Sequence, residues 1–315
     1  MAEPALVSTS EHESADPDDA VPVLEPGTEI APGYEVVEHL RRGDALDVYA
    51  AFSTERLCSC VAKTVRPDRA HVERVRNRLA QEGFLLQTLS HPLLLRGLAT
   101  FTRPEVVVIV ETVPGPTLED TIEERYRRLP AASICHLGTQ VAAATHYLHS
   151  CGYLHLDIRP SNIIGHGGIA KLIDLSLARP PGLVPRGMGS HLYLSPEQAR
   201  GGYVTEAADS WGIGATLYEA ATGLSPFDAF DAQDAALLDK DAYLQLHRPP
   251  PPLGRHRRRL HPGLVSLINA CLREEPTERP STREIWRSLT DVLAEIEPPE
   301  ADEDDEPDDW TAATE

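Results

Sequence analysis

At residues 155–162 the chain reads His155-Leu156-Asp157-Ile158-Arg159-Pro160-Ser161-Asn162. An apolar helical pattern precedes this stretch, and a short Gly-rich turn and an apolar strand that ends at Asp174 follow it. Asp157 can accept a proton from a hydroxyl group, and the amide of Asn162 and the carboxylate of Asp174 can share a hard cation. These are the groups that magnesium-assisted phosphoryl transfer requires.

A second pair of charged residues lies upstream in apolar surroundings. Lys63 is one of only three lysines in the chain and lies in a predicted strand, Leu57–Val65, where the period of two puts it on one face with Val61. Glu82 belongs to a helical stripe with steps of three and four, made of Val72, Val75, Leu79, Glu82 and Leu86. A carboxylate on an apolar helix face needs a partner, so we predict a Lys63–Glu82 ion pair. The simpler alternative is a lysine that snorkels from a sheet edge.

Taken in order, these motifs resemble those of the protein kinase family. Residues 155–162 are similar to the pattern H-R-D-L-K-P-x-N, and Asp174 stands where the family has D-F-G. Gly189–Glu197 resembles the end of the activation segment, G-T-x-x-Y-x-[AS]-P-E, and by this resemblance Arg279 pairs with Glu197. The resemblance covers roughly residues 34 to 294. Pro160 and Ser190 are typical of the serine/threonine class, and the Arg- and Ala-rich composition is typical of its bacterial branch.

The resemblance implies an α+β fold with two lobes. The small N-lobe, about residues 31–113, is expected to be a mainly antiparallel sheet with one helix, and the larger C-lobe, about 114–294, to be mainly helical. Periodicity agrees, because it predicts strands within 34–51, 57–65 and 105–113 and helices over 72–89, 132–150 and 284–296.

The resemblance also assigns roles to the charged residues. Asp157 is expected to be the catalytic base, and Arg159 to stabilise the γ-phosphoryl group of ATP. Lys63, fixed by Glu82, is expected to hold the α and β phosphates, and Asn162 and Asp174 to hold Mg²⁺. The residues expected to contact the nucleotide are Leu40, Gly43, Val48, Val61, Lys63, Val110, Glu111, Val113 and Ile164.

Several positions depart from the family pattern. In the glycine-rich loop only Gly43 is kept, while Arg41 and Leu46 replace the outer glycines and crowd the approach of backbone to phosphate. Val61 replaces the usual alanine and adds bulk where the adenine is expected. If the site does not accommodate it, this bulk weakens nucleotide binding by about 1 kcal/mol. Ser176 replaces the glycine of D-F-G and stiffens the backbone beside Asp174. Leu156 replaces the arginine that grips a phosphorylated activation loop, so we expect an enzyme that activation-loop phosphorylation does not switch.

Three functions remain open at this point. The retained catalytic residues favour an active serine/threonine protein kinase. The altered glycine-rich loop, with Leu156 and Ser176, favours a pseudokinase that binds nucleotide or regulates partners. A small-molecule phosphotransferase is the third, and the Ser195-Pro196-Glu197 segment favours protein substrates over it.

The net charge of −20 is concentrated at the two ends of the chain. Residues 1–30 carry eight acids and residues 295–315 carry eleven, with no Lys or Arg in either, so residues 31–294 hold 30 acids against all 29 bases. We predict disordered acidic tails over 1–30 and 295–315 that contact basic partners, fold back on the domain or only solubilise it. A near-neutral middle argues against nucleic acid as a partner.

Other features of the composition indicate a cytoplasmic protein. Five cysteines without a C-x-x-C pair favour a reduced compartment. The longest strongly apolar run, Val106–Val110, is too short to span a membrane, and the acidic first thirty residues do not resemble a signal peptide. The expected partners are ATP and protein substrates, and the sequence does not predict an oligomeric state.

Overall fold

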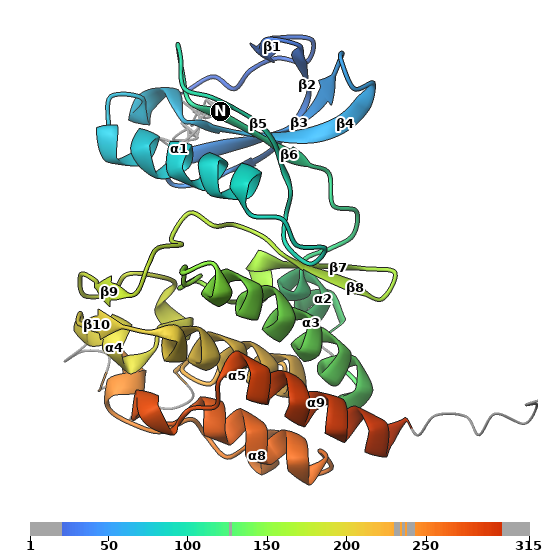
Figure 1. Ribbon diagram of the computed structural model, residues 1–315, viewed down its shortest axis with the longest axis vertical. Coiled ribbons are helices and arrows are strands. Elements are labelled where there is room, and N and C mark those ends of the chain that lie inside the picture. The colour runs from blue at the N-terminus through green and yellow to red at the C-terminus, as the bar shows by residue number, and fades with distance from the viewer. Residues whose placement is uncertain (1–20, 126–127, 230–233, 235–236, 238–242, 298–315) are drawn as a thin grey trace, which may run out of the picture. The chain divides into compact units, whose positions relative to one another are not determined.

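The structure is a computed structural model that describes residues 21–125, 128–229, 234, 237 and 243–297 (Figure 1). The chain divides into two compact units. The first comprises the described residues up to Gln87 together with 97–112, and the second comprises 88–96 and the described residues from Val113 onward.

A six-stranded antiparallel sheet forms most of the first unit. Its strand order is β1-β2-β3-β4-β6-β5, and each neighbouring pair runs antiparallel. One face carries the core of this unit, in which Tyr49, Ala62 and Ile109 are almost completely buried. The strands are β1 (Glu29–Ala31), β2 (Tyr34–Arg42), β3 (Leu46–Ser53), β4 (Cys58–Val65), β5 (Gly97–Phe101) and β6 (Val107–Glu111).

One helix, α1 (Glu73–Thr88), packs against this sheet (Figure 1). Three residues of the predicted helical stripe, Leu79, Glu82 and Leu86, are buried, which confirms this part of the stripe. Gly83 lets the helix lie close to the sheet. A Cβ at this position would overlap Thr100 Oγ1 and lie 2.7 Å from Val108 Cγ2.

The packing of the first unit includes residues that the sequence assigned to the N-terminal tail. Residues 21–30 were predicted to belong to the N-terminal tail. In the structure Val23 and Leu24 pack against the core, and Leu24 N donates a hydrogen bond of 3.1 Å to the Tyr49 hydroxyl. The remainder of the predicted tails, residues 1–20 and 298–315, lies outside the described residues.

Helices dominate the second unit. α3 (Ala131–Ser150) and α5 (Glu206–Thr222) are extensively buried, and α9 (Thr282–Ile296) packs along α3 (Figure 1). Its described residues also form two short antiparallel strand pairs, β7 (Ile163–His166) with β8 (Ile169–Leu172) and β9 (Gly182–Leu183) with β10 (Tyr203–Val204). The other α-helices described are α2 (Leu118–Arg125), α4 (Pro196–Arg200), α7 (Leu253–His256) and α8 (Pro262–Cys271).

An antiparallel sheet with one helix and a mainly helical second unit confirm the predicted α+β fold class. The predicted strand over 105–113 was too long, because β6 ends at Glu111 and Pro114 soon follows, which has no backbone N–H for a sheet. Among the described residues, no helix has both the length and the hydrophobicity needed to span a bilayer.

Candidate functional site

The predicted pair of Lys63 and Glu82 is present in the first unit. Lys63 Nζ lies 2.7 Å from Glu82 Oε1, and the two side chains are only 12% and 0% exposed. Alternate residues of β4 pack into the core, which leaves Val61 and Lys63 on the opposite face. Because the charge-assisted contact is short and buried, it fixes the ammonium group of Lys63.

Three of the residues predicted to contact nucleotide share this sheet face with Lys63. Val48 lies opposite Lys63 in the β3–β4 register, and Val61 lies opposite Val110 in the β4–β6 register. Side chains directly opposed across a strand pair project to the same face, so these four form one surface. Leu40 lies at an irregularity of β2 between His39 and Arg41 and is half exposed.

The remaining predicted nucleotide contacts are arranged differently. Glu111 lies opposite Cys60, which is buried in the core, so its side chain projects to the other face of the sheet from that of Val110. Only the backbone of Glu111 therefore suits a ligand on the Lys63 face. Val113 and Ile164 belong to the second unit, where Ile164 of β7 forms an isolated bridge with Thr117.

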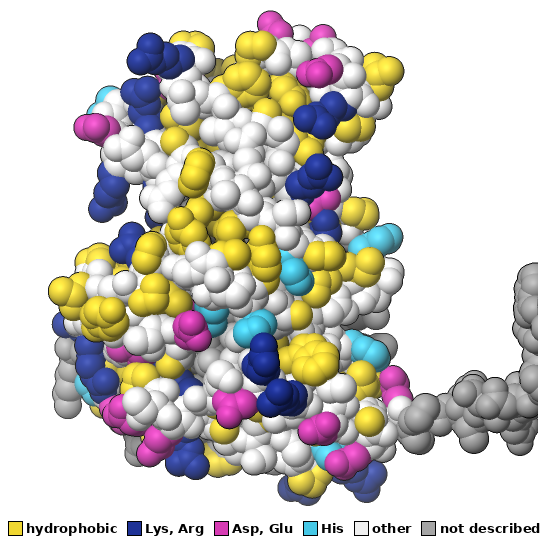
Figure 2. All heavy atoms as spheres, in the orientation of Figure 1, with side chains coloured by type: hydrophobic (Ala, Val, Ile, Leu, Met, Phe, Trp, Pro, Cys, Tyr) yellow, Lys and Arg dark blue, Asp and Glu magenta, His cyan; other side chains and the backbone are white. Residues whose placement is uncertain are grey.

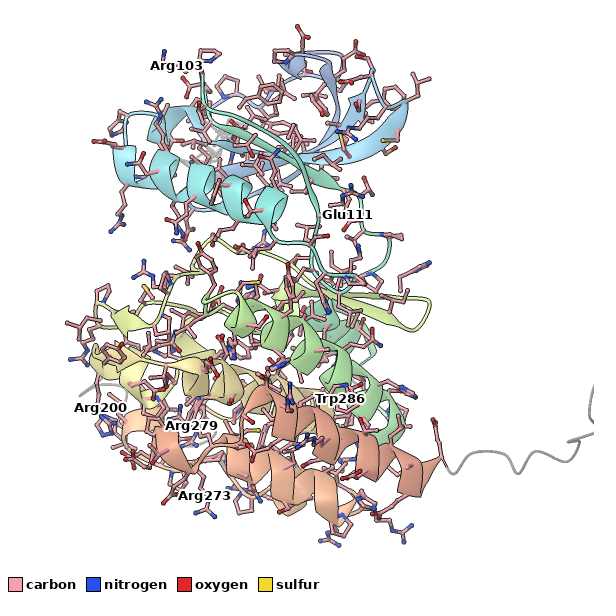
Figure 3. All side chains as sticks on the ribbon, in the orientation of Figure 1. Arg103, Glu111, Arg200, Arg273, Arg279 and Trp286 are labelled. Carbon is pink, nitrogen blue, oxygen red and sulfur yellow. The ribbon has the colours of Figure 1, made fainter. Side chains whose placement is uncertain are left out.

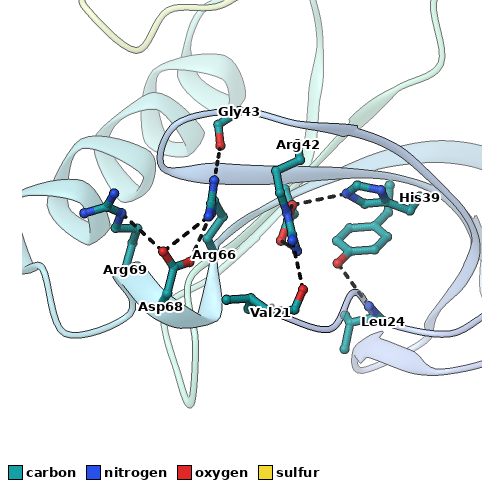
Figure 4. Close-up of polar contacts among 10 residues, drawn as sticks. Val21, Leu24, His39, Arg42, Gly43, Arg66, Asp68 and Arg69 are labelled. Carbon is teal, nitrogen blue, oxygen red and sulfur yellow. Dashed lines mark hydrogen bonds and ion pairs between the residues drawn. The ribbon is translucent and has the colours of Figure 1, made fainter. Parts of the chain in front are cut away.

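A buried carboxylate joins the strands on either side of the loop at Gly43. Asp47 is completely buried and accepts hydrogen bonds from Arg42 Nε at 2.9 Å and Nη2 at 3.2 Å (Figure 4). His39 Nε2 lies 3.1 Å from the same carboxylate, and Arg42 Nη1 also donates to Val21 O. The strand before the loop is thus linked to the strand after it and to the N-terminal segment.

The turn itself satisfies its own backbone groups. Gly43 N donates to Leu46 O at 2.8 Å, and Gly43 O accepts from Arg66 Nη1 at 3.1 Å (Figure 4). A Cβ at Gly43 would make only an ordinary contact of 3.4 Å, and Gly43 does not have a positive φ. Gly43 therefore closes a tight, braced turn here, and its N–H points to Leu46 O.

In the second unit the stretch 155–162 places Asp157 within a set of hydrogen bonds. Asp157 Oδ1 accepts from Ser190 N at 3.0 Å, and Oδ2 accepts from Asn162 Nδ2 at 3.0 Å. Arg159 Nε lies 3.8 Å from Oδ2. The predicted base, Arg159 and Asn162 are therefore brought together, and the carboxylate is oriented from two sides.

Asp209 at the start of α5 holds the backbone that precedes Asp157. Its carboxylate accepts from His155 N at 2.8 Å, Leu156 N at 2.7 Å and His149 Nε2 at 2.8 Å. Leu156 has a φ of 63°, which is uncommon for a branched residue and costs energy. Burial alone would raise the pKa of the Asp209 carboxyl, but the bond from His149 and the neighbouring imidazoles outweigh it, so this pKa is lowered.

The two predicted metal ligands lie on either side of the β7–β8 hairpin. Ile173 N donates to Asn162 O at 2.9 Å, which brings the residue before Asp174 to Asn162. Asn162 Nδ2 donates to Asp157 O at 2.8 Å as well as to its carboxylate. Because the NH₂ group of Asn162 is committed in this way, its amide oxygen is the atom offered to a cation. An amide oxygen and a carboxylate fit a hard cation such as Mg²⁺.

The segment after Asp174 is held against residues 155–162 without a charged residue at position 156. Leu156 is 4% exposed and packs in a cluster with Leu154, Val184, Val204 and Ala208, flanked by Leu177 and Met188. Gln198 Nε2 donates to Leu156 O at 3.0 Å and to Met188 O at 2.9 Å. Gly189 has a φ of 132°, and a Cβ there would lie 2.6 Å from Leu194 Cδ2, so only glycine fits.

The predicted contact of Arg279 with Glu197 is also present. Arg279 Nη1 and Nη2 donate to the two Glu197 carboxylate oxygens at 2.7 and 2.9 Å, and the guanidinium lies 5.0 Å from the centre of the Trp211 ring. Figure 3 marks Arg279 between α5 and α8. This bidentate pair anchors α4, and with it the end of the segment that contacts Asp157.

A second acid buried near this segment titrates at an unusual pH. Tyr193 donates from its hydroxyl to Glu219 Oε2 at 2.7 Å. Burial is the main cause that raises the pKa of Glu219 to about 7, and nearby acids including Glu119 add to the rise. The same burial raises the pKa of the Tyr193 hydroxyl, so it stays protonated and donates.

Sequence reasoning did not identify Asp47, Gln198 or Asp209 as site residues. Asp47 occupies an inward position of the alternating strand β3, and an acid at such a position requires partners. Gln198 completes a capping box with Ser195, a spacing that can be read from sequence. The role of Asp209 could not be read locally, because its partners lie more than fifty residues away.

Comparisons with known proteins agree with this geometry. Residues 34–289 match the family described as the protein kinase domain, which is more than half of the chain. A probable serine/threonine-protein kinase of Clostridium perfringens is 27% identical over 84% of this chain and 38% of its own length. The serine/threonine-protein kinase pkn3 of Myxococcus xanthus is 27% identical over 83% of this chain and 50% of its own.

A more distant organism offers a similar match. Serine/threonine-protein kinase 36 of Pongo abelii is 32% identical over 78% of this chain and 18% of its own length. The chain thus spans half or less of the length of the three relatives described, and the similarity concerns the part that carries the motifs.

Proposed function

This chain belongs to the protein kinase family, and on that premise we propose that it is an active serine/threonine protein kinase of the cytoplasm. It transfers the γ-phosphoryl group of ATP to Ser or Thr hydroxyls of protein substrates. The serine/threonine kinases to which it is similar support this class of reaction.

The observation that carries the proposal is the environment of Asp157. Its carboxylate is oriented by Ser190 N and Asn162 Nδ2 and lies beside Arg159. A base must be held within reach of the proton that it accepts, and these contacts hold it while leaving it close to a cation. A protein that only used the fold as a scaffold would not need this arrangement.

The proposed step uses Asp157 as the proton acceptor. The substrate oxygen forms a bond to the γ phosphorus as the bond from that phosphorus to the β–γ bridging oxygen breaks. The hydroxyl proton passes to the Asp157 carboxylate, and ADP leaves. Arg159 stabilises negative charge on the transferred group, and Lys63, held by Glu82, binds the α and β phosphates.

Asn162 and Asp174 are the residues proposed to hold Mg²⁺. Their oxygens match its preference for hard ligands, and the amide group of Asn162 is turned by its bonds to Asp157. When bound, the cation neutralises charge on the ATP phosphates. Val48, Val61 and Val110 supply the apolar face for the adenine ring, beside Lys63.

We further propose that the enzyme needs no phosphorylation of its activation segment. Leu156 occupies the position from which an arginine would bind a phosphate, and it packs with Val184 instead. Of the hydroxyls in this segment, Ser195 is completely buried and Tyr193 is bound to Glu219. Apolar packing and Gln198 then do what a phosphate–arginine pair does in a switched kinase.

One observation favours the alternative of a pseudokinase. The turn at Gly43 is braced by Arg66 and closed on Leu46 O, so its N–H is engaged within the loop. A nucleotide that needs this N–H would have to compete with that bond. Nucleotide binding therefore distinguishes the two functions.

The test measures binding and catalysis on the same full-length chain. A thermal shift with ATP should appear with Mg²⁺ and be lost in Asp174→Ala. Phosphotransfer to a Ser/Thr peptide library should be present in the wild type and reduced by about 10²- to 10⁴-fold in Asp157→Asn. This substitution retains an oxygen that can accept from Ser190 N, so its unfolding temperature serves as the folding control.

Two outcomes would count against the proposal. Binding of ATP with Mg²⁺ but equal, negligible phosphotransfer by wild type and Asp157→Asn would favour the pseudokinase. If no nucleotide changes the unfolding temperature, both the active kinase and the nucleotide-binding scaffold are contradicted.

A further inference from the structure

A groove between α3 and α9 lies on the surface of the second unit. Its volume is about 500 Å³, and its lining comes from α3, α9 and the segment before β5. His146 Nδ1 of α3 lies 3.3 Å from Thr282 Oγ1 of α9, a contact that joins the two helices. The ring of His91 stacks on that of Tyr147, with 5.2 Å between the ring centres. Trp286 is 43% exposed and projects from α9 at the edge of the groove (Figure 3).

The charged lining of the groove has one sign. Arg283 and Arg287 line it from α9, and no Asp or Glu is among the lining residues in the part of the chain that the structure describes. The nearest acid along the helix, Glu284, is engaged by Ser281 N and Oγ in the helix cap at 2.8 and 2.7 Å, although Arg287 also helps to lower its pKa. Figure 2 shows basic and His side chains beside a hydrophobic patch where α3 and α9 meet.

This concentration of basic groups is a local feature. Residues 31–294 are close to neutral, with 30 acids and 29 bases. A groove with two guanidinium groups, imidazoles and an exposed indole suits an extended segment that is rich in carboxylates. Each exposed ion pair alone is weak, so several of them, or a tether, are needed for stable binding.

The chain itself supplies such a segment. Residues 298–315 contain nine acids and no Lys or Arg, and eight of the nine lie within 300–309. α9, which carries Arg283, Trp286 and Arg287, ends at Ile296, two residues before this segment begins. From there back to Trp286 is roughly 15 Å along the helix, a distance that about five extended residues cover.

We propose that the acidic segment 300–309 binds in the α3–α9 groove of its own chain, with its carboxylates on Arg283 and Arg287. The tether provides an effective concentration in the millimolar range, which compensates for the weakness of individual ion pairs. The groove is then a docking site that the acidic segment occupies. A more acidic partner can displace the segment by competing for the same arginines. This inference does not depend on phosphotransfer.

The test uses the full-length chain with Trp310→Phe, so that Trp286 is the exposed tryptophan and Trp211, 2% exposed, is silent to a quencher. Acrylamide is the quencher because it carries no charge. Replacing the eight acids of 300–309 by Asn and Gln should raise the quenching constant of Trp286 about twofold if the docked form holds half or more of the molecules. NaCl at about 0.5 M should have the same effect on the parent chain, since it screens exposed charge.

Two matched controls separate docking from general charge effects. Replacing the six acids of residues 1–20 (Glu3, Glu11, Glu13, Asp16, Asp18 and Asp19) should leave the quenching constant unchanged. Arg283→Gln with Arg287→Gln should raise it as the tail replacement does, whereas Arg258→Gln with Arg259→Gln should not.

Three results would overturn the proposal. The first is no change in quenching when the acids of 300–309 are replaced. The second is an equal change when the N-terminal acids are replaced. The third is protection of Trp286 that disappears on dilution, because a segment of a second copy, unlike the chain's own, is lost at low concentration.

Discussion

The loop at Gly43 and the stretch at Leu156 both depart from the kinase pattern, and the structure compensates for each in a different way. Around Gly43 the compensation is polar, because Asp47 is buried and bonded to Arg42 and His39. Around Leu156 it is apolar, because the leucine is buried among side chains of the following segment. If the proposed function is right, the first departure should lower the affinity for nucleotide, and the second should remove a switch by phosphorylation.

The largest expected effect comes from restoring the family arginine. In Leu156→Arg a charge would enter a cluster of Leu154, Val184 and Val204 with no acid among them, so we expect a loss of about 3 kcal/mol or more in the free energy of unfolding. Chemical denaturation measures this loss, and phosphotransfer should fall with it. Leu156→Met, which conserves volume, is the control and should cost less than about 1.5 kcal/mol. An arginine variant as stable as the wild type would show that the apolar cluster does not hold the segment.

The pH dependence of stability tests another contact of the same segment. Folding raises the pKa of Glu219 from 4.5 to about 7, so the folded protein binds this proton more tightly than the unfolded chain. The stabilisation is complete below pH 4.5 and is lost as the pH rises to about 7, by roughly 1 to 3 kcal/mol. Urea denaturation between pH 5 and 8 should show the decline. Glu219→Gln should flatten it, and an unchanged slope in that variant would assign the decline to other groups.

A smaller effect is expected from weakening the polar brace. Asp47→Asn keeps the shape of the side chain but removes the charge that Arg42 contacts, and we expect a loss of about 1.5 kcal/mol in stability. Asp44→Asn, at an exposed position of the same turn, makes the same chemical change and should have almost no effect. If both substitutions changed the free energy of unfolding equally, the contacts of Asp47 with Arg42 and His39 would not be what stabilises the loop.

The smallest expected effect comes from restoring glycines in the loop. Arg41→Gly with Leu46→Gly should lower the stability by less than about 1 kcal/mol for each glycine. The same pair should tighten MgATP binding by about two- to fivefold, because crowding by side chains is removed. Val37→Gly is the control, since Val37 is an exposed residue of β2 and should change stability alone. Unchanged affinity in the restored loop would mean that the braced turn, and not the side chains, limits binding.

Sequence predicted those contacts that have local patterns. The Lys63–Glu82 pair followed from a strand period of two and a helical stripe. The spacing of Asp157, Asn162 and Asp174 marked them as candidate site residues, and the first two are hydrogen-bonded to each other in the structure. The contact that braces the loop could not be predicted, because Arg42 and Asp47 come within hydrogen-bond distance only when β2 and β3 pair. The pinning of residues 155 and 156 likewise depends on Asp209, which is distant in sequence.

The fold shows the same division. Long periodic segments such as α3 and α9 were predicted to within two residues of their observed ends. The strand β5 was not predicted. All five of its residues are half-buried, so its two faces do not differ in burial, and its sequence lacks the alternation of polar and apolar residues that marks a strand. It is defined by pairing with β6, which sequence periodicity does not register.

The central claim is that apolar packing at Leu156 replaces a phosphate switch in an active kinase. The most direct test measures phosphotransfer by the full-length wild-type chain before and after phosphatase treatment, with mass spectrometry to verify that Ser176 and Ser190 carry no phosphate. We predict equal rates before and after treatment and a strong loss in Asp157→Asn. A rate that falls after phosphatase treatment and recovers on rephosphorylation would contradict the claim.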